Sequence, residues 1–118
     1  MPTLDKLLPL HADMANWRHD LHAHPETAFE EQRTSALVAR QLESFGLRVH
    51  RGLGRTGVVG TLSAGSGKRA IGLRADMDAL HIHEQNAFGH RSRNEGKMHA
   101  CGHDGHTAML LGAAKYLS

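Results

Sequence analysis

The segment Met98–Thr107, with the sequence MHACGHDGHT, holds the densest group of chemically active side chains in the chain. In it, Cys101 and His103 are separated by one glycine and come just before an expected helix. A helix N-terminus favours anions and a divalent cation lowers the pKa of a thiol. The pair could therefore bind one metal ion, or the sulfur could bridge two. Asp104 and His106 would then be candidates to orient the ligands.

Other interpretations of this segment remain open from the residues alone. A cysteine–histidine nucleophile pair needs a histidine within hydrogen-bond reach, and the spacing does not exclude it. A structural zinc site is disfavoured because such sites usually have four ligands with several cysteines, whereas Cys101 is the only cysteine. A small buried cysteine beside helix-capping residues is the remaining alternative. A catalytic metal site is the favoured interpretation.

A second motif, Leu73–Leu80 with the sequence LRADMDAL, ends an expected strand in two aspartates. Asp76 and Asp78 are separated by one residue, so strand alternation puts both on one side of the strand. They would lie at its carboxyl end, where open α/β sheets place their sites. Aspartates that only cap the following turn would give the same pattern. The residues alone favour neither reading.

Three further motifs fail the requirements of the sites that they resemble. The GxGxxG pattern over residues 52–57 is followed by an expected strand instead of the helix of a dinucleotide site, which favours a hairpin turn. The segment 63–69 lacks the first glycine of a phosphate-binding loop. His83 and Glu84 begin a zinc-protease HExxH motif, but Ala87 occupies its last position.

The composition predicts one cytoplasmic domain that binds neither nucleic acid nor a membrane. The chain has 118 residues, 40% of them hydrophobic and 4% aromatic, which is enough for one aliphatic core. Its formal net charge of +2 is too small and too scattered to indicate nucleic-acid binding. No stretch approaches the ~20 apolar residues of a membrane span. A single cysteine cannot form an internal disulfide, which fits a reducing compartment.

Apolar spacing predicts helices and short strands that would position these side chains. The first helix should end before Pro25, and the second should begin near Thr27 in a capping box with Glu30 and stop at Gly46. Strands are expected at 47–50, 58–62 and 70–77, a long loop at 78–98, and a third helix at 106–117. This order suggests a three-layer α/β sandwich or part of one.

Three segments in this order resemble the N-terminal part of a metal-dependent amidohydrolase family. They are WRHDLHAHPETAFEE, LRADMDAL and MHACGHDGHTAMLLGAA, and the resemblance runs from about Trp17 to Leu117. The family is the hippurate hydrolase, N-acyl-amino-acid amidohydrolase and auxin-conjugate hydrolase group of the aminoacylase-type metallopeptidases. The resemblance implies a three-layer α/β/α, zinc-peptidase-like catalytic domain and hydrolysis of the amide bond of small N-acyl amino acids. It also implies two divalent metal ions, Mn²⁺ or Zn²⁺, per full-length subunit.

The resemblance also implies residue roles and a domain organisation. Cys101 and His103 match metal ligands of the family, and Asp78 matches a catalytic-site aspartate that orients a ligand. Asp76 falls where related enzymes have a metal-binding histidine, whereas no ligand role follows for the typical segment His24–Glu26. Residues 1–118 would form the N-terminal part of the catalytic domain. The catalytic glutamates, the remaining ligands and the dimerisation domain of a homo-oligomer would lie beyond it.

On this reading the 118 residues alone are expected to be inactive. Two alternatives to the amidohydrolase remain at this point. One is a non-catalytic metal-binding fragment, and the other is a hydrolase that uses Cys101 as its nucleophile.

Overall fold

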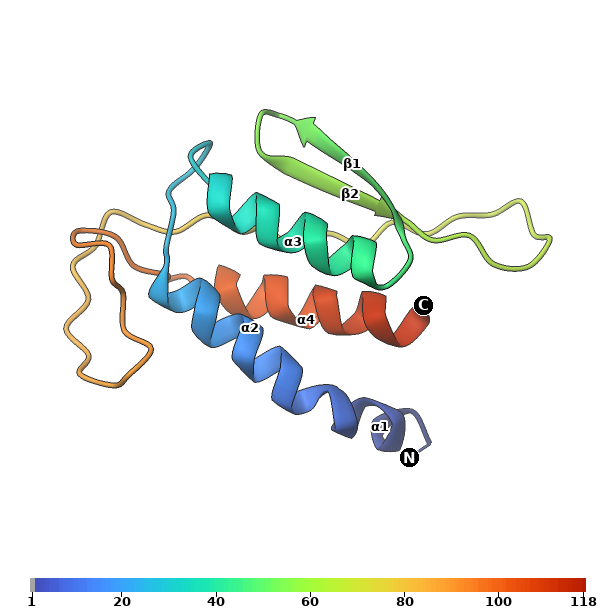
Figure 1. The fold of residues 1–118 in the computed structure, drawn as a ribbon, viewed down its shortest axis with the longest axis horizontal. Coiled ribbons are helices and arrows are strands. Elements are labelled where there is room, and N and C mark those ends of the chain that lie inside the picture. The colour runs from blue at the N-terminus through green and yellow to red at the C-terminus, as the bar shows by residue number, and fades with distance from the viewer. Residues whose placement is uncertain (1) are drawn as a thin grey trace.

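The computed structural model describes residues 2–118 as three long helices that lie side by side with a two-stranded hairpin packed on one of them (Figure 1). In chain order the elements are α1 (Pro2–Leu7), the 3-10 helix η1 (Leu8–Leu10), α2 (His11–Ala23), α3 (Gln32–Ser44), β1 (Arg48–Leu53), β2 (Gly57–Thr61) and α4 (His103–Leu117). Helix α4 lies between α2 and α3, and the hairpin contacts α3. Within residues 2–118, every helix is too short or too polar to cross a lipid bilayer.

The core forms where α2, α3 and α4 meet. Its fully buried members are leucines from all three helices, and partly buried apolar residues such as Trp17 surround them. The leucines are Leu21, Leu37, Leu42 and Leu111. Helix α2 ends at Ala23 as expected, because the residue before a proline avoids the helical region and His24 has φ −128° and ψ 59°. The core therefore fixes the direction of α2, which carries His19 and His22, and of α4, which carries His103 and His106.

The prediction that the second helix begins near Thr27 is wrong by about five residues. Thr27 does donate a hydrogen bond to Glu30 Oε2 (2.7 Å), but α3 begins only at Gln32. The carboxylate of Glu26 accepts hydrogen bonds from two backbone N–H groups in the first turn of α3, at 2.9 and 2.6 Å. A cap supplied from outside the helix therefore sets its start. Its end is as expected, since Gly46 has φ +87°.

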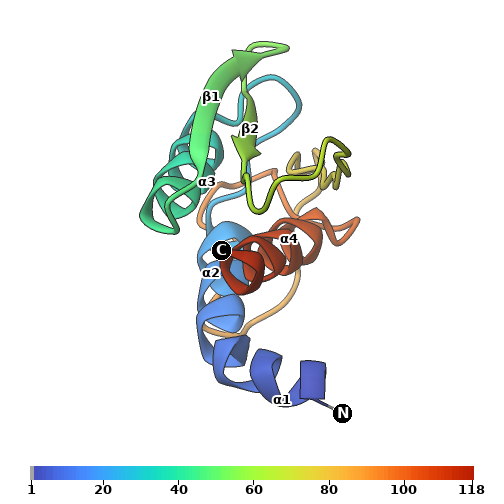
Figure 2. The same ribbon diagram turned by 90° about the vertical axis from the view of Figure 1, so that its right-hand side faces the viewer.

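The hairpin confirms that the GxGxxG pattern is a turn. Strands β1 and β2 pair in antiparallel fashion, with an irregularity between Arg51 and Leu53. Gly52 and Gly54 have φ values of +91° and +58°, which glycine adopts at little cost. Figure 2, turned by 90°, shows the hairpin beside α3 and away from α1 and α2. The first strand is longer than expected, because β1 continues to Leu53.

The strand expected at 70–77 does not form among the described residues. Strand structure requires a neighbour to hydrogen-bond with, and the only pairings near this segment are single bridges from Thr27 to Ala79 and from Leu80 to Met98. Ile71 and Leu73 are accordingly exposed, at 85% and 57%. The long loop expected after it is confirmed, while the last helix begins at His103, three residues earlier than expected.

Candidate metal centre

Three side chains converge on the first turn of α4 to form a candidate metal site. His103 and His106 lie three residues apart, so they share one face of the helix, and their ring centroids are 5.4 Å apart. His106 Nδ1 lies 2.8 Å from Asp76 Oδ1, and His103 Nε2 lies 3.4 Å from Asp76 Oδ2. The potential ligand atoms of the three residues all lie within 4.8 Å of one another. We call Asp76, His103 and His106 the metal cluster.

Asp78 contacts His103 on the side of the ring opposite Asp76. His103 Nδ1 lies 2.9 Å from Asp78 Oδ1 and 3.0 Å from the Asp78 carbonyl oxygen. Both of these atoms are acceptors, so Nδ1 must carry the proton. In the neutral ring, the lone pair is then on Nε2, which points toward Asp76. A carboxylate on the second nitrogen is the usual partner of a metal-binding histidine.

The donors of the metal cluster suit a divalent cation. Two imidazoles and one carboxylate form a ligand set typical of zinc enzymes, and such groups also bind Mn²⁺. The hydrogen bond from His106 is the main reason that the pKa of Asp76 lies below its ordinary value. Asp76 is therefore an anion at neutral pH, as a cation ligand must be. These three residues fit a metal ion by their chemistry and their mutual distances.

Cys101 lies outside this cluster. It is exposed and precedes Gly102, which caps α4 with a φ of +91°. The only group of potential ligands found within residues 2–118 is the one that contains Asp76 and the two histidines. The structure therefore brings His103 and Asp78 together but does not place Cys101 with them. A ligand role for Cys101 stays a prediction.

Asp104, expected to orient ligands, contacts helix α2 instead. Its side chain is 2% exposed, and its Oδ2 lies 2.8 Å from His22 Nδ1 and 3.3 Å from Arg18 Nε. The other ring nitrogen of His22 lies 3.0 Å from Glu84 Oε2. Sequence reasoning missed His22 and Glu84. A usable signal was the spacing of Arg18 and His22, which lie four residues apart beside the apolar stripe of α2.

The segment His24–Glu26 holds the long loop against α2. The backbone carbonyl of Glu26 accepts a hydrogen bond from Ala79 N–H (2.8 Å), and the Pro25 carbonyl accepts one from Asn94 Nδ2 (2.9 Å). Arg93 N–H also donates to the carbonyl of Ala23 (2.8 Å). The segment therefore positions the chain directly after Asp78. This is a structural role that the sequence did not suggest.

His99 is a second buried histidine that sequence reasoning missed. It is 4% exposed, and within residues 2–118 neither of its ring nitrogens has a hydrogen-bond partner. Burial lowers its pKa, and this effect outweighs the opposing influence of the Asp104 carboxylate. His99 is therefore a buried, neutral ring two residues before Cys101.

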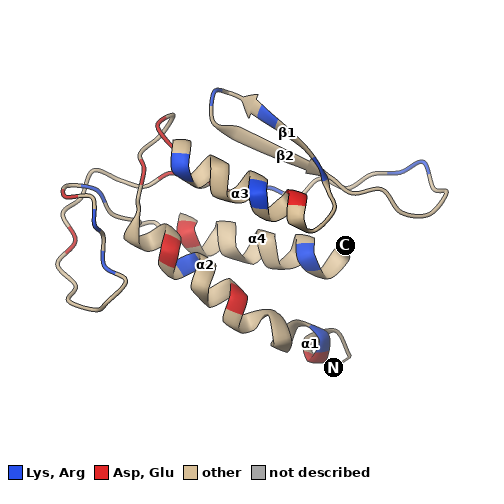
Figure 3. Ribbon diagram, in the orientation of Figure 1, with Lys and Arg blue, Asp and Glu red and all other residues tan. Residues whose placement is uncertain are grey.

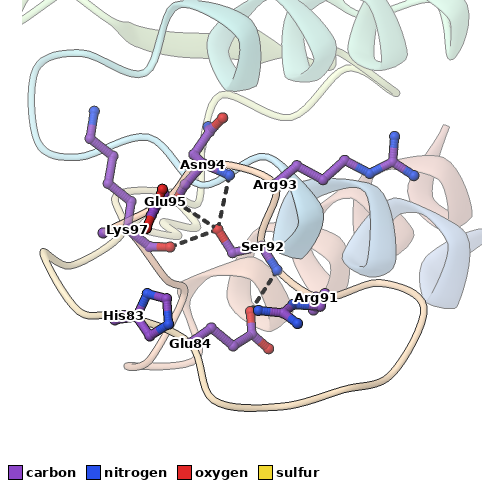
Figure 4. Close-up of a pocket in the computed structure, with 9 residues that line it drawn as sticks. His83, Glu84, Arg91, Ser92, Arg93, Asn94, Glu95 and Lys97 are labelled. Atoms are coloured by element: carbon purple, nitrogen blue, oxygen red, sulfur yellow. Dashed lines mark hydrogen bonds between the residues drawn. The ribbon is translucent and has the colours of Figure 1, made fainter.

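A polar pocket lies in the long loop, separate from the metal cluster. Its lining comprises His83, Glu84 and residues 91–97 (Figure 4). In Figure 4 the Glu84 carboxylate receives a hydrogen bond from Ser92, whose N–H donates to Glu84 Oε1 at 2.7 Å. Asn86 Nδ2 donates to the other carboxylate oxygen at 3.0 Å. Burial would raise the pKa of Glu84, but these bonds and the contact with His22 lower it to about 2.

Comparisons with known proteins give a consistent result. Residues 72–118 match the model of peptidase family M20/M25/M40. The chain is 48% identical to the hippurate hydrolase of Campylobacter jejuni over 118 residues, which cover 100% of this chain and 31% of that protein. It is 51% identical to the N-acyl-L-amino acid amidohydrolase of Geobacillus stearothermophilus over 109 residues, or 90% of this chain and 29% of that protein.

A solved structure extends the likeness to the fold. The YxeP protein of Bacillus subtilis, a dinuclear metal binding peptidase from the M20 family, matches with a TM-score of 0.88 and 39% identity. The match covers 92% of this chain and 31% of that one. The chain thus spans about a third of the length of the relatives that it matches. The motifs, the fold and these likenesses all point to peptidase family M20/M25/M40, whose model the chain matches over residues 72–118.

Proposed function

We propose that the protein formed by this chain is a metal-dependent amidohydrolase that cleaves the amide bond of small N-acyl amino acids. The observation that carries the proposal is the metal cluster of Asp76, His103 and His106, with Asp78 on the second nitrogen of His103. The names of two relatives, a hippurate hydrolase and an N-acyl-L-amino acid amidohydrolase, supply the substrate class. Both names describe hydrolysis of an amide between an acyl group and an amino acid.

In this proposal the chain's own residues hold and orient two divalent ions, Mn²⁺ or Zn²⁺, per full-length subunit. His103 and Cys101 are ligands, Asp76 and His106 add donors to the site, and Asp78 keeps the Nδ1 proton on His103. A thiolate favours Zn²⁺, whereas carboxylates also suit Mn²⁺. Bound ions of this kind supply Lewis acidity to the scissile carbonyl and lower the pKa of the attacking water to about 7.

Residues 1–118 are, on this proposal, the N-terminal part of the catalytic domain. A catalytic zinc ion normally takes three protein ligands and keeps one position for water, so two ions need more donors than the metal cluster offers. We place the general base, the remaining ligands and a dimerisation domain elsewhere in a homo-oligomeric protein. The 118 residues alone are then inactive. A reducing compartment, the cytoplasm, would keep the Cys101 thiol available as a ligand.

The proposal is tested by metal content and turnover measured on the same variants. For the full-length protein, His103→Ala and Cys101→Ala should lose bound metal and hydrolysis of N-acetyl and N-benzoyl amino acids together. The control is His50→Ala, which changes an exposed histidine of β1. Turnover by the 118-residue chain with added Mn²⁺ would contradict the proposal that the general base and the remaining ligands lie outside these residues. Full metal content together with full turnover in His103→Ala would overturn the metal site itself.

A second candidate is a hydrolase that uses Cys101 as its nucleophile, since this thiol is exposed and lies outside the metal cluster. The two candidates differ in one variant. If Cys101→Ala keeps its metal and loses all turnover, the nucleophile reading takes precedence. A chain that binds metal while the full-length protein hydrolyses none of these substrates would instead support a non-catalytic metal-binding role.

A further inference from the structure

His22 has a carboxylate on each of its two ring nitrogens. The ring is 3% exposed, Nδ1 lies 2.8 Å from Asp104 Oδ2, and Nε2 lies 3.0 Å from Glu84 Oε2. Both carboxylates are also buried, at 2% and 3% exposure. The three partners come from α2, the long loop and α4, so one side chain joins three elements. Figure 3 shows acidic and basic segments where the ends of α2 and α4 lie side by side.

The hydrogen-bond inventory of this group requires a charged ring. An ionised carboxylate can only accept, and the depressed pKa of Glu84 keeps that group ionised at neutral pH. Asp104 forms an ion pair with Arg18, so its carboxylate is an acceptor as well. Each ring nitrogen of His22 therefore faces an accepting carboxylate and donates to it, which makes the ring an imidazolium. Arg18, whose Nε lies 3.3 Å from Asp104 Oδ2, supplies a second positive charge. Two cations thus balance two buried anions, the condition under which buried charge is tolerated.

Aromatic rings shield this group from water on the loop side. Phe88 meets the edge of the His22 ring at a centroid distance of 5.8 Å, and His90 does so at 5.6 Å. His90 in turn stacks on Phe88 at 4.0 Å and on His19 at 3.9 Å. Shielded hydrogen bonds between ionised groups are stronger than exposed ones, and removing one partner leaves an uncompensated buried charge. The loop is therefore tied to α2 through His22.

The buried group of His22, Asp104 and Glu84 is connected to the metal cluster along the chain, through both of its carboxylate residues. Asp104 is the residue after His103, in the first turn of α4. Glu84 lies six positions after Asp78 and organises the loop by accepting from Ser92 N–H and Asn86 Nδ2. Fixing Asp104 and Glu84 relative to α2 therefore fixes the backbone on both sides of the contact between Asp78 and His103.

We propose that His22 is a buried imidazolium that acts as a positioning residue for the metal ligand His103. The inference rests on the proposed function, since it assigns His22 to that metal site. His22 itself touches neither the metal cluster nor Asp78. It acts by holding Asp104 and Glu84, and its charge is what makes both contacts possible.

Nuclear magnetic resonance of the histidine rings tests the charge directly. In ¹⁵N-labelled protein at neutral pH, long-range ¹H–¹⁵N correlations should show both ring nitrogens of His22 protonated. The His22 signals are assigned by their absence in His22→Gln. One unprotonated nitrogen in the wild-type ring would overturn the imidazolium. This measurement needs only the wild-type fold, so it holds even if a variant folds poorly.

Variants test the positioning role. His22→Gln should weaken Mn²⁺ binding by about tenfold, at the lower end of the roughly 10–100-fold loss typical of residues behind a ligand. His11→Gln, at the exposed start of α2, is the matched control and should bind Mn²⁺ like the wild type. The double variant His22→Gln, Glu84→Gln removes one charge of each sign. It should therefore melt at a higher temperature than His22→Gln alone.

The outcomes separate this inference from the proposed function. Unchanged Mn²⁺ affinity in His22→Gln would overturn the positioning role, and a double variant less stable than the single one would overturn the charge balance. If the wild-type protein binds no Mn²⁺ or Zn²⁺, the proposed function fails and the positioning role fails with it. The ring-nitrogen signals would still decide whether His22 is an imidazolium.

Discussion

Replacing Asp78 with alanine should weaken metal binding by about tenfold and no more. The change removes the carboxylate that lies 2.9 Å from His103 Nδ1. The backbone carbonyl of residue 78, 3.0 Å from the same nitrogen, remains as a second acceptor. The ring thus keeps its Nδ1 proton and the lone pair on Nε2. What is lost is the negative charge that makes the imidazole a stronger ligand.

The size of the effect follows from this partial replacement. Losing the partner of a metal-binding histidine typically costs about 10–100-fold in affinity. Because one of the two acceptors survives, we expect roughly tenfold, which is about 1.4 kcal/mol in binding free energy. Isothermal titration of the metal-free protein with Mn²⁺ measures it. Asp5→Ala, which removes an exposed aspartate of α1, is the control and should leave the affinity unchanged.

Two results would refute this reasoning in different ways. A loss of several hundredfold would show that the Asp78 carboxylate binds the metal itself. Unchanged affinity would show that the carbonyl alone orients His103 and that the carboxylate charge contributes nothing. Neither result depends on turnover.

Three further predictions concern the elements that support the site. Glu26→Gln should lower the unfolding free energy by about 2 kcal/mol, because a charged acceptor for the first turn of α3 is lost. Thermal unfolding measures this loss, with Glu43→Gln, an exposed change on the same helix, as the control. Gly57→Ala should lower the unfolding free energy by about 1–3 kcal/mol in the same assay, since the new Cβ would overlap the backbone carbonyl of Leu53. A melting temperature equal to that of the wild type would contradict this. The pKa of Glu84 falls from its ordinary 4.5 to about 2 on folding, so its contribution of about 3 kcal/mol is complete above pH 4.5 and is lost as the pH falls toward 2. Glu84→Gln should therefore show a flatter loss of stability between pH 4.5 and 2, and parallel acid-unfolding curves for the two proteins would refute this.

Local signals predicted the helix ends, and distant contacts set the features that were missed. Pro25 and Gly46 act through their own backbone preferences, so the sequence shows where α2 and α3 stop. The start of α3 depends on Glu26, which lies six residues before it, and Thr27 forms a bridge with Ala79 instead of a helix. Alternating apolar residues at 70–77 looked like a strand, but alternation alone supplies no hydrogen-bonding neighbour.

The candidate site shows the same division between local pattern and distant contact. Asp76 and Asp78 both contact helix α4, although the strand whose alternation predicted a common side for them does not form. The buried contact of His22 with Glu84 was not predictable, because 62 residues separate them and the motifs in which they occur give no reason to pair them. A pattern of single residues shows which groups could do chemistry. It does not show which of them pair across elements.

The spacing of the two acidic residues is matched to the spacing of the two histidines. Asp76 contacts His106 and Asp78 contacts His103, so the acidic segment runs past α4 in the opposite direction to the helix. Two residues of extended chain span about 6.6 Å, and three residues of helix rise about 4.5 Å, a difference that side chains can bridge. Two adjacent aspartates would point to opposite sides of the extended chain. Aspartates four positions apart would overshoot the histidine pair by about 9 Å. The DxD spacing of the segment therefore matches the HxxH spacing of the helix, so that each aspartate meets one histidine. Neither pattern forms a site until the fold places the segment beside the helix.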